Sequence, residues 1–147
     1  MCQFSSIDQA LDYAIARERV AYDFYSQLVG WVKRPEIKAR LQEFALQEQQ
    51  HREKLETVKA GKASIGEDDA EGFVLAEIDE EVRLDQYMNY AAVLMVAMKR
   101  EKEAYQLYMR LASAVQAEGL QHLFRGLAQE EASHKLWLEL EYDWTRG

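Results

Sequence analysis

A glutamate and a histidine three residues apart occur twice in the sequence, as Glu48-x-x-His51 and as Glu131-x-x-His134. On a helix, residues three apart lie on one face, so the carboxylate and the imidazole of each pair can bind one metal ion or a bridged pair of ions. One copy of so short a motif arises easily by chance. Two copies in matching sequence contexts indicate a metal site to which both contribute.

The two motifs are parts of an internal repeat. An offset of 83 residues carries Glu48 onto Glu131 and His51 onto His134 without a gap. The same offset pairs Leu11 with Leu94, Ala14 with Ala97, Glu18 with Glu101, Ala21 with Ala104, Tyr22 with Tyr105, Tyr25 with Tyr108, Leu28 with Leu111, Ala45 with Ala128 and Leu55 with Leu138. Each half therefore places Glu-x-x-Ala-Tyr-x-x-Tyr on one helix and Ala-x-x-Glu-x-x-His on the next. Two such halves predict a four-helix bundle with approximate two-fold symmetry.

Hydrophobic residues recur at helical spacing in four segments that would carry the repeat. Pro35 suits the first turn of the second helix, and Asn89 can cap the third. Only about two residues separate the first two helices, which makes them antiparallel neighbours. Strand signals are nearly absent, and parts of the long crossover at about 61–88 could be helical. We expect one all-α domain over 1–147, an antiparallel four-helix bundle whose helices lie at about 6–33, 35–60, 89–115 and 118–142.

Glu18 and Glu101 interrupt the apolar stripes of their helices, since each follows one alanine by four residues and precedes another by three. An ionised carboxylate in a core is very costly unless it is paired or bound to metal. Four glutamates would balance the charge of two divalent cations, and two neutral histidines would add none. The predicted metal ligands are therefore Glu18, Glu48, His51, Glu101, Glu131 and His134. Oxygen-rich ligation with one imidazole per ion suits iron or manganese better than zinc, although adventitious zinc could occupy the site.

Composition limits the partners and the chemistry. The net charge of −8 argues against nucleic acid or an anionic membrane surface as a partner. Cys2 is the only cysteine, so this chain can form neither an internal disulfide nor a site with four thiolates. The sequence shows neither a signal peptide nor an apolar run of about 18 residues. We therefore expect a cytoplasmic protein.

The repeated plan, with Glu18 and Tyr25 before Glu48 and His51, resembles the ferritin-like di-iron domain of the rubrerythrins over about residues 6–142. The resemblance implies two iron ions in a non-haem centre that reacts with hydrogen peroxide or oxygen, in oxidative-stress protection or iron oxidation. It also implies bridging carboxylates, which would include either Glu48 and Glu131 or Glu18 and Glu101. A homodimer, with or without helix exchange across the crossover, is a further expectation from the resemblance.

The sequence departs from the rubrerythrin pattern in two respects. Rubrerythrins carry a rubredoxin domain with four cysteines, whereas this chain has Cys2 alone, so an external electron donor such as a rubredoxin-like protein is expected. Rubrerythrins also have an extra glutamate one turn after the third-helix ligand, where this chain has Ala104. The resulting ligand set is more symmetric and is similar to that of a bacterioferritin, but Gln49 stands where a bacterioferritin has its haem-binding methionine.

Several aromatic residues and one histidine could have either a structural or a functional role. Tyr25 and Tyr108 could hydrogen-bond to ligating carboxylates or carry an electron, or they could be packing residues. We expect Tyr22 and Tyr105 to lie in the core, and His122, which falls outside the repeat, to lie on the surface. Packing or subunit contacts are expected of Trp31, Trp137 and Trp144.

The leading hypothesis is a di-iron oxidoreductase, a peroxidase or ferroxidase, that an outside donor returns to the reduced state. The first alternative is a non-enzymatic protein that binds or handles iron. The second is a scaffold bundle with a degenerate site. Turnover with a reductant separates the first two, and the effect of ligand substitutions on metal content tests the third.

Overall fold

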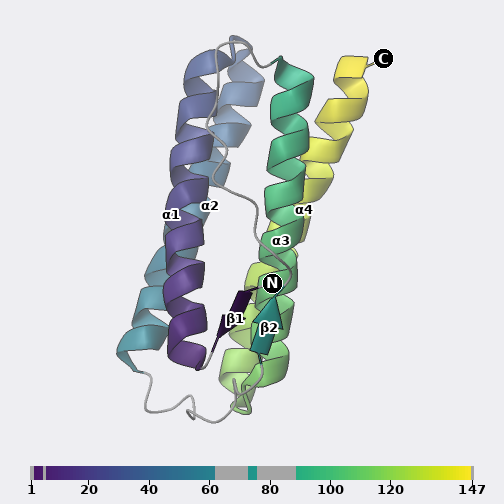
Figure 1. The fold of residues 1–147 in the computed structure, drawn as a ribbon. Helices are drawn as coiled ribbons and strands as arrows, with labels where there is room; N and C mark the ends of the chain where they lie inside the picture. The colour runs from purple at the N-terminus through teal and green to yellow at the C-terminus, as the bar shows by residue number, and fades with distance from the viewer. Residues whose placement is uncertain (1, 5, 62–72, 76–88, 147) are drawn as a thin grey trace. The chain divides into compact units, whose positions relative to one another are not determined.

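The computed structural model describes residues 2–4, 6–61, 73–75 and 89–146. The described residues form the helices α1 (Ile7–Trp31), α2 (Pro35–Ala60), α3 (Tyr90–Ala114) and α4 (Glu118–Arg146), and the short strands β1 (Cys2–Phe4) and β2 (Phe73–Leu75) (Figure 1). Contacts along the chain divide it into two compact units. One holds the first helix pair, α1 and α2, and the other holds β1, β2 and the second helix pair, α3 and α4.

The first helix pair is an antiparallel hairpin. Near the link, the Lys38 ammonium donates a hydrogen bond to the Val29 carbonyl at 3.0 Å. Further along, the rings of Tyr25 and Phe44 meet edge to face with centroids 5.4 Å apart. At the far end, Lys59 of α2 forms an ion pair with Asp12 of α1. These contacts run in opposite directions along the two helices, which confirms the arrangement predicted from the short link.

Local sequence signals set the ends of α2. Pro35 is the first residue of the helix, where its missing N–H is not needed, and Arg34 before it is extended, with φ −75° and ψ 123°. At the other end, the Gly61 amide donates to the Thr57 carbonyl at 3.1 Å and so closes the last turn. Both boundaries agree with those predicted from the sequence.

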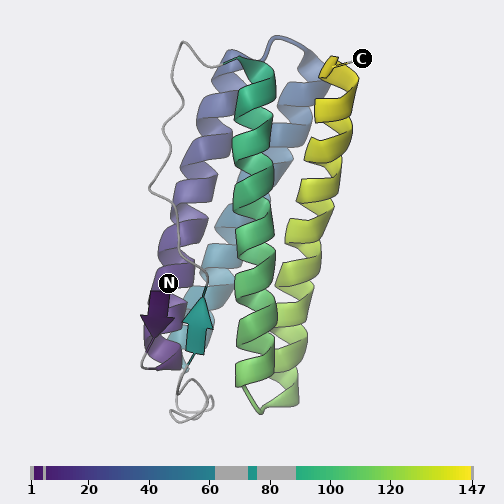
Figure 2. The ribbon, with the colours of Figure 1, turned by 45° about the vertical axis from the view of Figure 1, so that its right-hand side comes forward.

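The second helix pair is also held by contacts at both ends. The side-chain oxygen of Asn89 accepts a hydrogen bond from the Ala92 amide at 2.7 Å, which is the predicted N-cap of α3. At the link, the Gln121 side-chain amide donates to the Val115 carbonyl at 2.9 Å. Figure 2 shows α3 and α4 side by side along their lengths. The helix α4 ends at Arg146, beyond the predicted end at about 142.

The two strands are the part of the fold without a sequence signal. They form an antiparallel ladder in which Cys2 pairs with Leu75 and Phe4 with Phe73. Three residues per strand are too few to show an alternating pattern, so the near absence of strand signals left this pairing unpredicted. Part of the crossover that could have been helical is thus the strand β2. The rest of the predicted crossover lies outside the described residues.

The core consists of the apolar stripes that the helical spacing predicted. On α2, Ile37, Leu41, Phe44 and Leu55 are buried, and on α3 and α4 the buried residues include Val93, Leu94, Leu111, Phe124, Leu127 and Leu138. The buried stripes also include glutamates and histidines. None of the helices described here is long and apolar enough to cross a membrane.

Candidate metal centre

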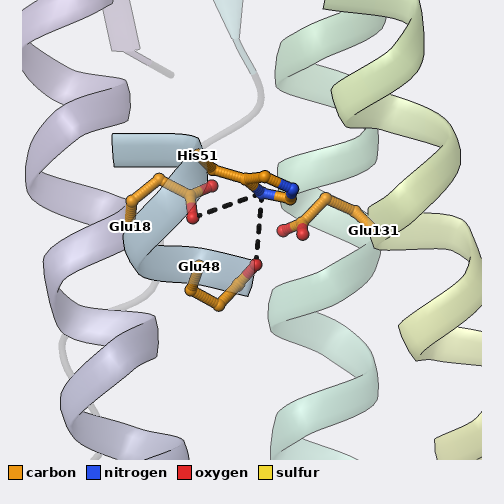
Figure 3. Close-up of side chains that lie close together, drawn as sticks. All are labelled: Glu18, Glu48, His51 and Glu131. Carbon is orange, nitrogen blue, oxygen red and sulfur yellow. Dashed lines mark ion pairs between the residues drawn. The ribbon is translucent and has the colours of Figure 1, made fainter. Parts of the chain in front are cut away.

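The first helix pair brings together three of the predicted ligands. Glu18 comes from α1, and Glu48 and His51 come from consecutive turns of α2 (Figure 3). The Nδ1 atom of His51 lies 3.6 Å from Oε2 of Glu18 and 3.3 Å from Oε1 of Glu48. All three side chains are at most 2% exposed. The imidazole therefore lies against two carboxylates inside the protein.

The second helix pair repeats this geometry. Glu101 comes from α3, and Glu131 and His134 come from α4. The Nδ1 atom of His134 lies 3.5 Å from Oε2 of Glu101 and 3.6 Å from Oε1 of Glu131. These side chains are at most 3% exposed. The 83-residue repeat seen in the sequence is thus also a repeat of side-chain geometry.

Each of the two triplets has the dimensions of a metal site. Within a triplet, two carboxylates and one imidazole offer donor atoms that lie within 4.8 Å of one another. With metal–ligand bonds of about 2.1 Å, neighbouring donors on one ion stand roughly 3.0 to 3.4 Å apart, depending on the coordination geometry. The nitrogen–oxygen separations of 3.3 to 3.6 Å are close to this range. Either triplet could hold a cation after small side-chain movements.

Electrostatics also favours a cation here. Each triplet contains two buried carboxylates, and burial of an ionised carboxylate is costly without a compensating positive charge. An imidazole supplies such a charge only when it is protonated. A divalent cation would neutralise both carboxylates and leave the histidine neutral, the form in which it acts as a ligand. The donor set therefore fits a resident metal ion.

The helix geometry explains why these side chains meet. Glu48 and His51 occupy the same stripe of α2 as the buried residues Phe44 and Leu55, so the period that buries the leucines also buries the ligands. On α1, Ala14 is fully buried one turn before Glu18. A small side chain at that position leaves room for the carboxylates and the imidazole.

Tyr25 and Tyr108 are buried, with 2% and 1% of their surfaces exposed. The ring of Tyr25 packs edge to face against Phe24 and Phe44, with both centroid distances 5.4 Å. These contacts agree with the packing interpretation of Tyr25. A role for either tyrosine in hydrogen bonding to ligands or in electron transfer stays a prediction.

The prediction that Tyr22 and Tyr105 lie in the core was wrong. Their exposed fractions are 39% and 38%. Tyr22 has the helical spacing of a stripe residue, but it lies at the edge of the buried stripe, where a tyrosine can keep its ring partly in water. His122 is exposed, as predicted.

Sequence reasoning missed one buried carboxylate. Glu141 of α4 is 8% exposed, and its Oε1 accepts a hydrogen bond from the Tyr90 hydroxyl at 3.2 Å. It stands seven residues after His134, which keeps it on the same face of the helix. That spacing was the available signal, but the repeat hid it, because the matching position in the first half is Val58.

Comparison with known proteins agrees with this description. The sequence model of the rubrerythrin family matches residues 9–142. A hypothetical protein from Pyrococcus furiosus, 25% identical, is similar in structure over 94% of this chain and 89% of its own, with a TM-score of 0.78.

A second similar structure comes from Thermotoga maritima and is named as a candidate ferritin-like diiron-carboxylate protein. It is 21% identical and covers 97% of this chain and 98% of its own, with a TM-score of 0.80. No curated protein matches the sequence. These likenesses confirm the predicted fold class, an all-α ferritin-like four-helix bundle.

Proposed function

Since this chain belongs to the rubrerythrin family, we propose that it is a non-haem di-iron oxidoreductase that reduces hydrogen peroxide or oxygen. The observation that carries the proposal is the pair of buried triplets with matching geometry. The proposed iron ligands are Glu18, Glu48, His51, Glu101, Glu131 and His134.

The two triplets would act as halves of one centre. Each helix pair carries its triplet on an apolar stripe, and a pair of helices cannot bury such a stripe by itself. On the family resemblance, we propose that the four carboxylates and two imidazoles together hold two metal ions. The four negative charges would balance two divalent cations, which makes burial of the whole set tolerable. Either Glu48 and Glu131 or Glu18 and Glu101 would supply the bridging carboxylates.

Two bound ferrous ions would supply the two electrons that, with two protons, convert one hydrogen peroxide molecule into two water molecules and leave two ferric ions. The residues of this chain prepare that reaction. The four buried carboxylates would balance the charge of the two ferrous ions, and Nδ1 of each histidine lies within 3.6 Å of the two ligand oxygens beside it. The surrounding leucines and aromatic rings would limit access of water.

An outside reductant would be needed to restore the reduced metal pair. The 147 residues contain one cysteine, Cys2, whereas a rubredoxin-type centre uses four thiolates. An external donor such as a rubredoxin-like protein would return the metal pair to the reduced state after each turnover. A homodimer, with or without helix exchange, is proposed on the same family grounds.

A direct test measures metal and oxidation together. The purified protein is loaded anaerobically with ferrous iron, its metal content is measured by elemental analysis, and it is mixed with hydrogen peroxide or oxygen in a stopped-flow instrument. We expect two ions per chain and oxidation faster than that of free ferrous iron at the same concentration. Equal rates for the loaded protein and the free ion would refute the oxidoreductase proposal.

The symmetry of the ligand set gives a second candidate some support. At position 104, one turn after Glu101, the chain has a half-buried alanine in place of the extra rubrerythrin glutamate. The carboxylate that exchanges with a histidine in that family is therefore missing from this position. A protein that stores or delivers iron would oxidise its bound iron once, whereas an oxidoreductase would show repeated cycles when a reductant is supplied.

A further inference from the structure

A pocket on the first helix pair reaches one of the proposed ligands. It is lined by Glu18, Arg19, Tyr22, Gln49 and Arg52, and its volume is about 260 Å³. Arg19 and Tyr22 are exposed, Gln49 and Arg52 are half-buried, and Glu18 is buried. The lining therefore runs from the surface to a metal-ligand carboxylate. A cavity needs only roughly 10–15 Å³ of such space to hold one water, so a molecule the size of hydrogen peroxide fits easily.

The hydrogen-bonding groups that line the pocket favour hydrogen peroxide over oxygen. Two guanidinium groups, one phenol and one amide offer hydrogen-bond donors, and the phenol and the amide also accept. Hydrogen peroxide both donates and accepts hydrogen bonds, so this lining suits it better than it suits apolar oxygen. The positive charges of Arg19 and Arg52 balance the negative charges of Glu18 and of Glu56, which contacts Arg52 at 3.2 Å, so the pocket suits a neutral molecule and has no net negative charge to attract ferrous ions.

We propose that this pocket is the entry for hydrogen peroxide to the metal centre, and that ferrous ions enter by another route. The inference rests on the proposed function, because an entry matters only if the centre reacts with peroxide. Tyr22 and Gln49 also line a neighbouring hollow of about 330 Å³, which extends along the groove between α1 and α2 toward Leu46. Tyr22 thus stands between two hollows, and a bulky group attached there would obstruct the pocket.

The test attaches that group chemically. Tyr22→Cys is made in a Cys2→Ser background, so that the new thiol is the only one, and it is labelled with N-benzylmaleimide. The matched control is Tyr105→Cys, which has the same residue, repeat position and near-equal exposure, 38% against 39%. Three rates are compared before and after labelling: oxidation with peroxide, binding of azide, a small probe, to the oxidised protein, and ferrous loading.

We expect the label at position 22 to lower the peroxide rate and to slow azide binding by about tenfold or more, because access then becomes limiting. Metal content and the rate of ferrous loading should stay unchanged. The label at position 105 should change none of these quantities. Unchanged rates of azide binding and peroxide oxidation at position 22 would overturn the inference, and so would an equal slowing of ferrous loading. If the unlabelled Cys2→Ser protein fails to oxidise iron, the proposed function itself fails, which is a separate outcome.

Discussion

Glu48 and His51, one turn apart on α2, hold a carboxylate oxygen and an imidazole nitrogen 3.3 Å apart, and both side chains are fully buried. The two residues of the second motif, Glu131 and His134, do the same at 3.6 Å. Burial of a carboxylate beside an imidazole costs free energy, and the attraction between the two groups offsets little of that cost unless a cation binds to both. This relationship leads to the first prediction.

Replacement of one histidine should remove metal. His51→Ala leaves two buried carboxylates without their nitrogen ligand, and we expect the protein to lose at least one of the two proposed ions. His134→Ala should have the same effect because its surroundings match. His122→Ala, at an exposed histidine, is the control and should keep the metal content of the unaltered protein. Elemental analysis after gel filtration checks this, and full metal content in both ligand variants would favour a degenerate scaffold.

Removal of a buried charge should have opposite effects on the two metal states. Glu101→Gln keeps the shape of the side chain but removes the cost of burying an ionised carboxylate. We expect the metal-free variant to be more stable than the metal-free parent by about 1 kcal/mol or more. The stabilisation gained on adding ferrous iron should be smaller in the variant.

Chemical denaturation with and without metal measures both effects. The control is Glu43→Gln, at a side chain that is 63% exposed beside Arg40, where both differences should be close to zero. A loss of stability in the metal-free Glu101→Gln protein would contradict the electrostatic argument.

The leucines of the same stripe should dominate the stability of the first helix pair. Leu41 of α2 is fully buried, and we expect Leu41→Ala to lower the free energy of unfolding by about 2–5 kcal/mol. Leu46, five residues later on the same helix, is 54% exposed. Leu46→Ala should therefore change stability by less than about 0.5 kcal/mol. Urea unfolding followed by circular dichroism separates the two cases, and similar losses in both variants would show that the stripe is assigned wrongly.

The ion pair between Lys59 and Asp12 should contribute to stability in a pH-dependent way. The hydrogen bond to Asp12 raises the pKa of Lys59 above its usual value of 10.5. A raised pKa means that the contribution is fully present below the unfolded pKa and is lost as the pH rises through the folded pKa. Asp12→Asn should therefore lower the melting temperature slightly at pH 9, and the difference from the parent should shrink above pH 10.5. Melting curves of the parent and the variant at pH 9 and above pH 10.5 check this. A difference in melting temperature that grows with pH would contradict the prediction.

Much of this fold follows from the helical periodicity of the sequence. Residues at helical spacing become the buried stripes, and the charged residues at the same spacing become the two triplets, because a helix carries every residue of one face inward together. Asn89 and Pro35 mark the starts of α3 and α2 through local capping and backbone preferences, which can be predicted from the residue types.

The remaining features depend on information that local sequence lacks. The β1–β2 ladder joins residues about 70 positions apart through backbone hydrogen bonds, which leave no mark on three-residue segments. Tyr22 sits at the edge of a stripe, where periodicity does not decide between core and surface. Glu141 is buried through a hydrogen bond with Tyr90, a partner 51 residues earlier in the chain.

The repeat also has an evolutionary meaning. A hairpin with one such triplet and one apolar stripe would need a second copy to cover it, and the centre would then form only at concentrations that favour association. Two hairpins in one polypeptide replace that encounter with a high effective concentration. Each copy can then diverge separately. Gln49 lines a pocket where its counterpart is Ala132, and Glu141 is a buried acid where its counterpart is Val58, so the two halves differ in these side chains while they keep the same ligand set.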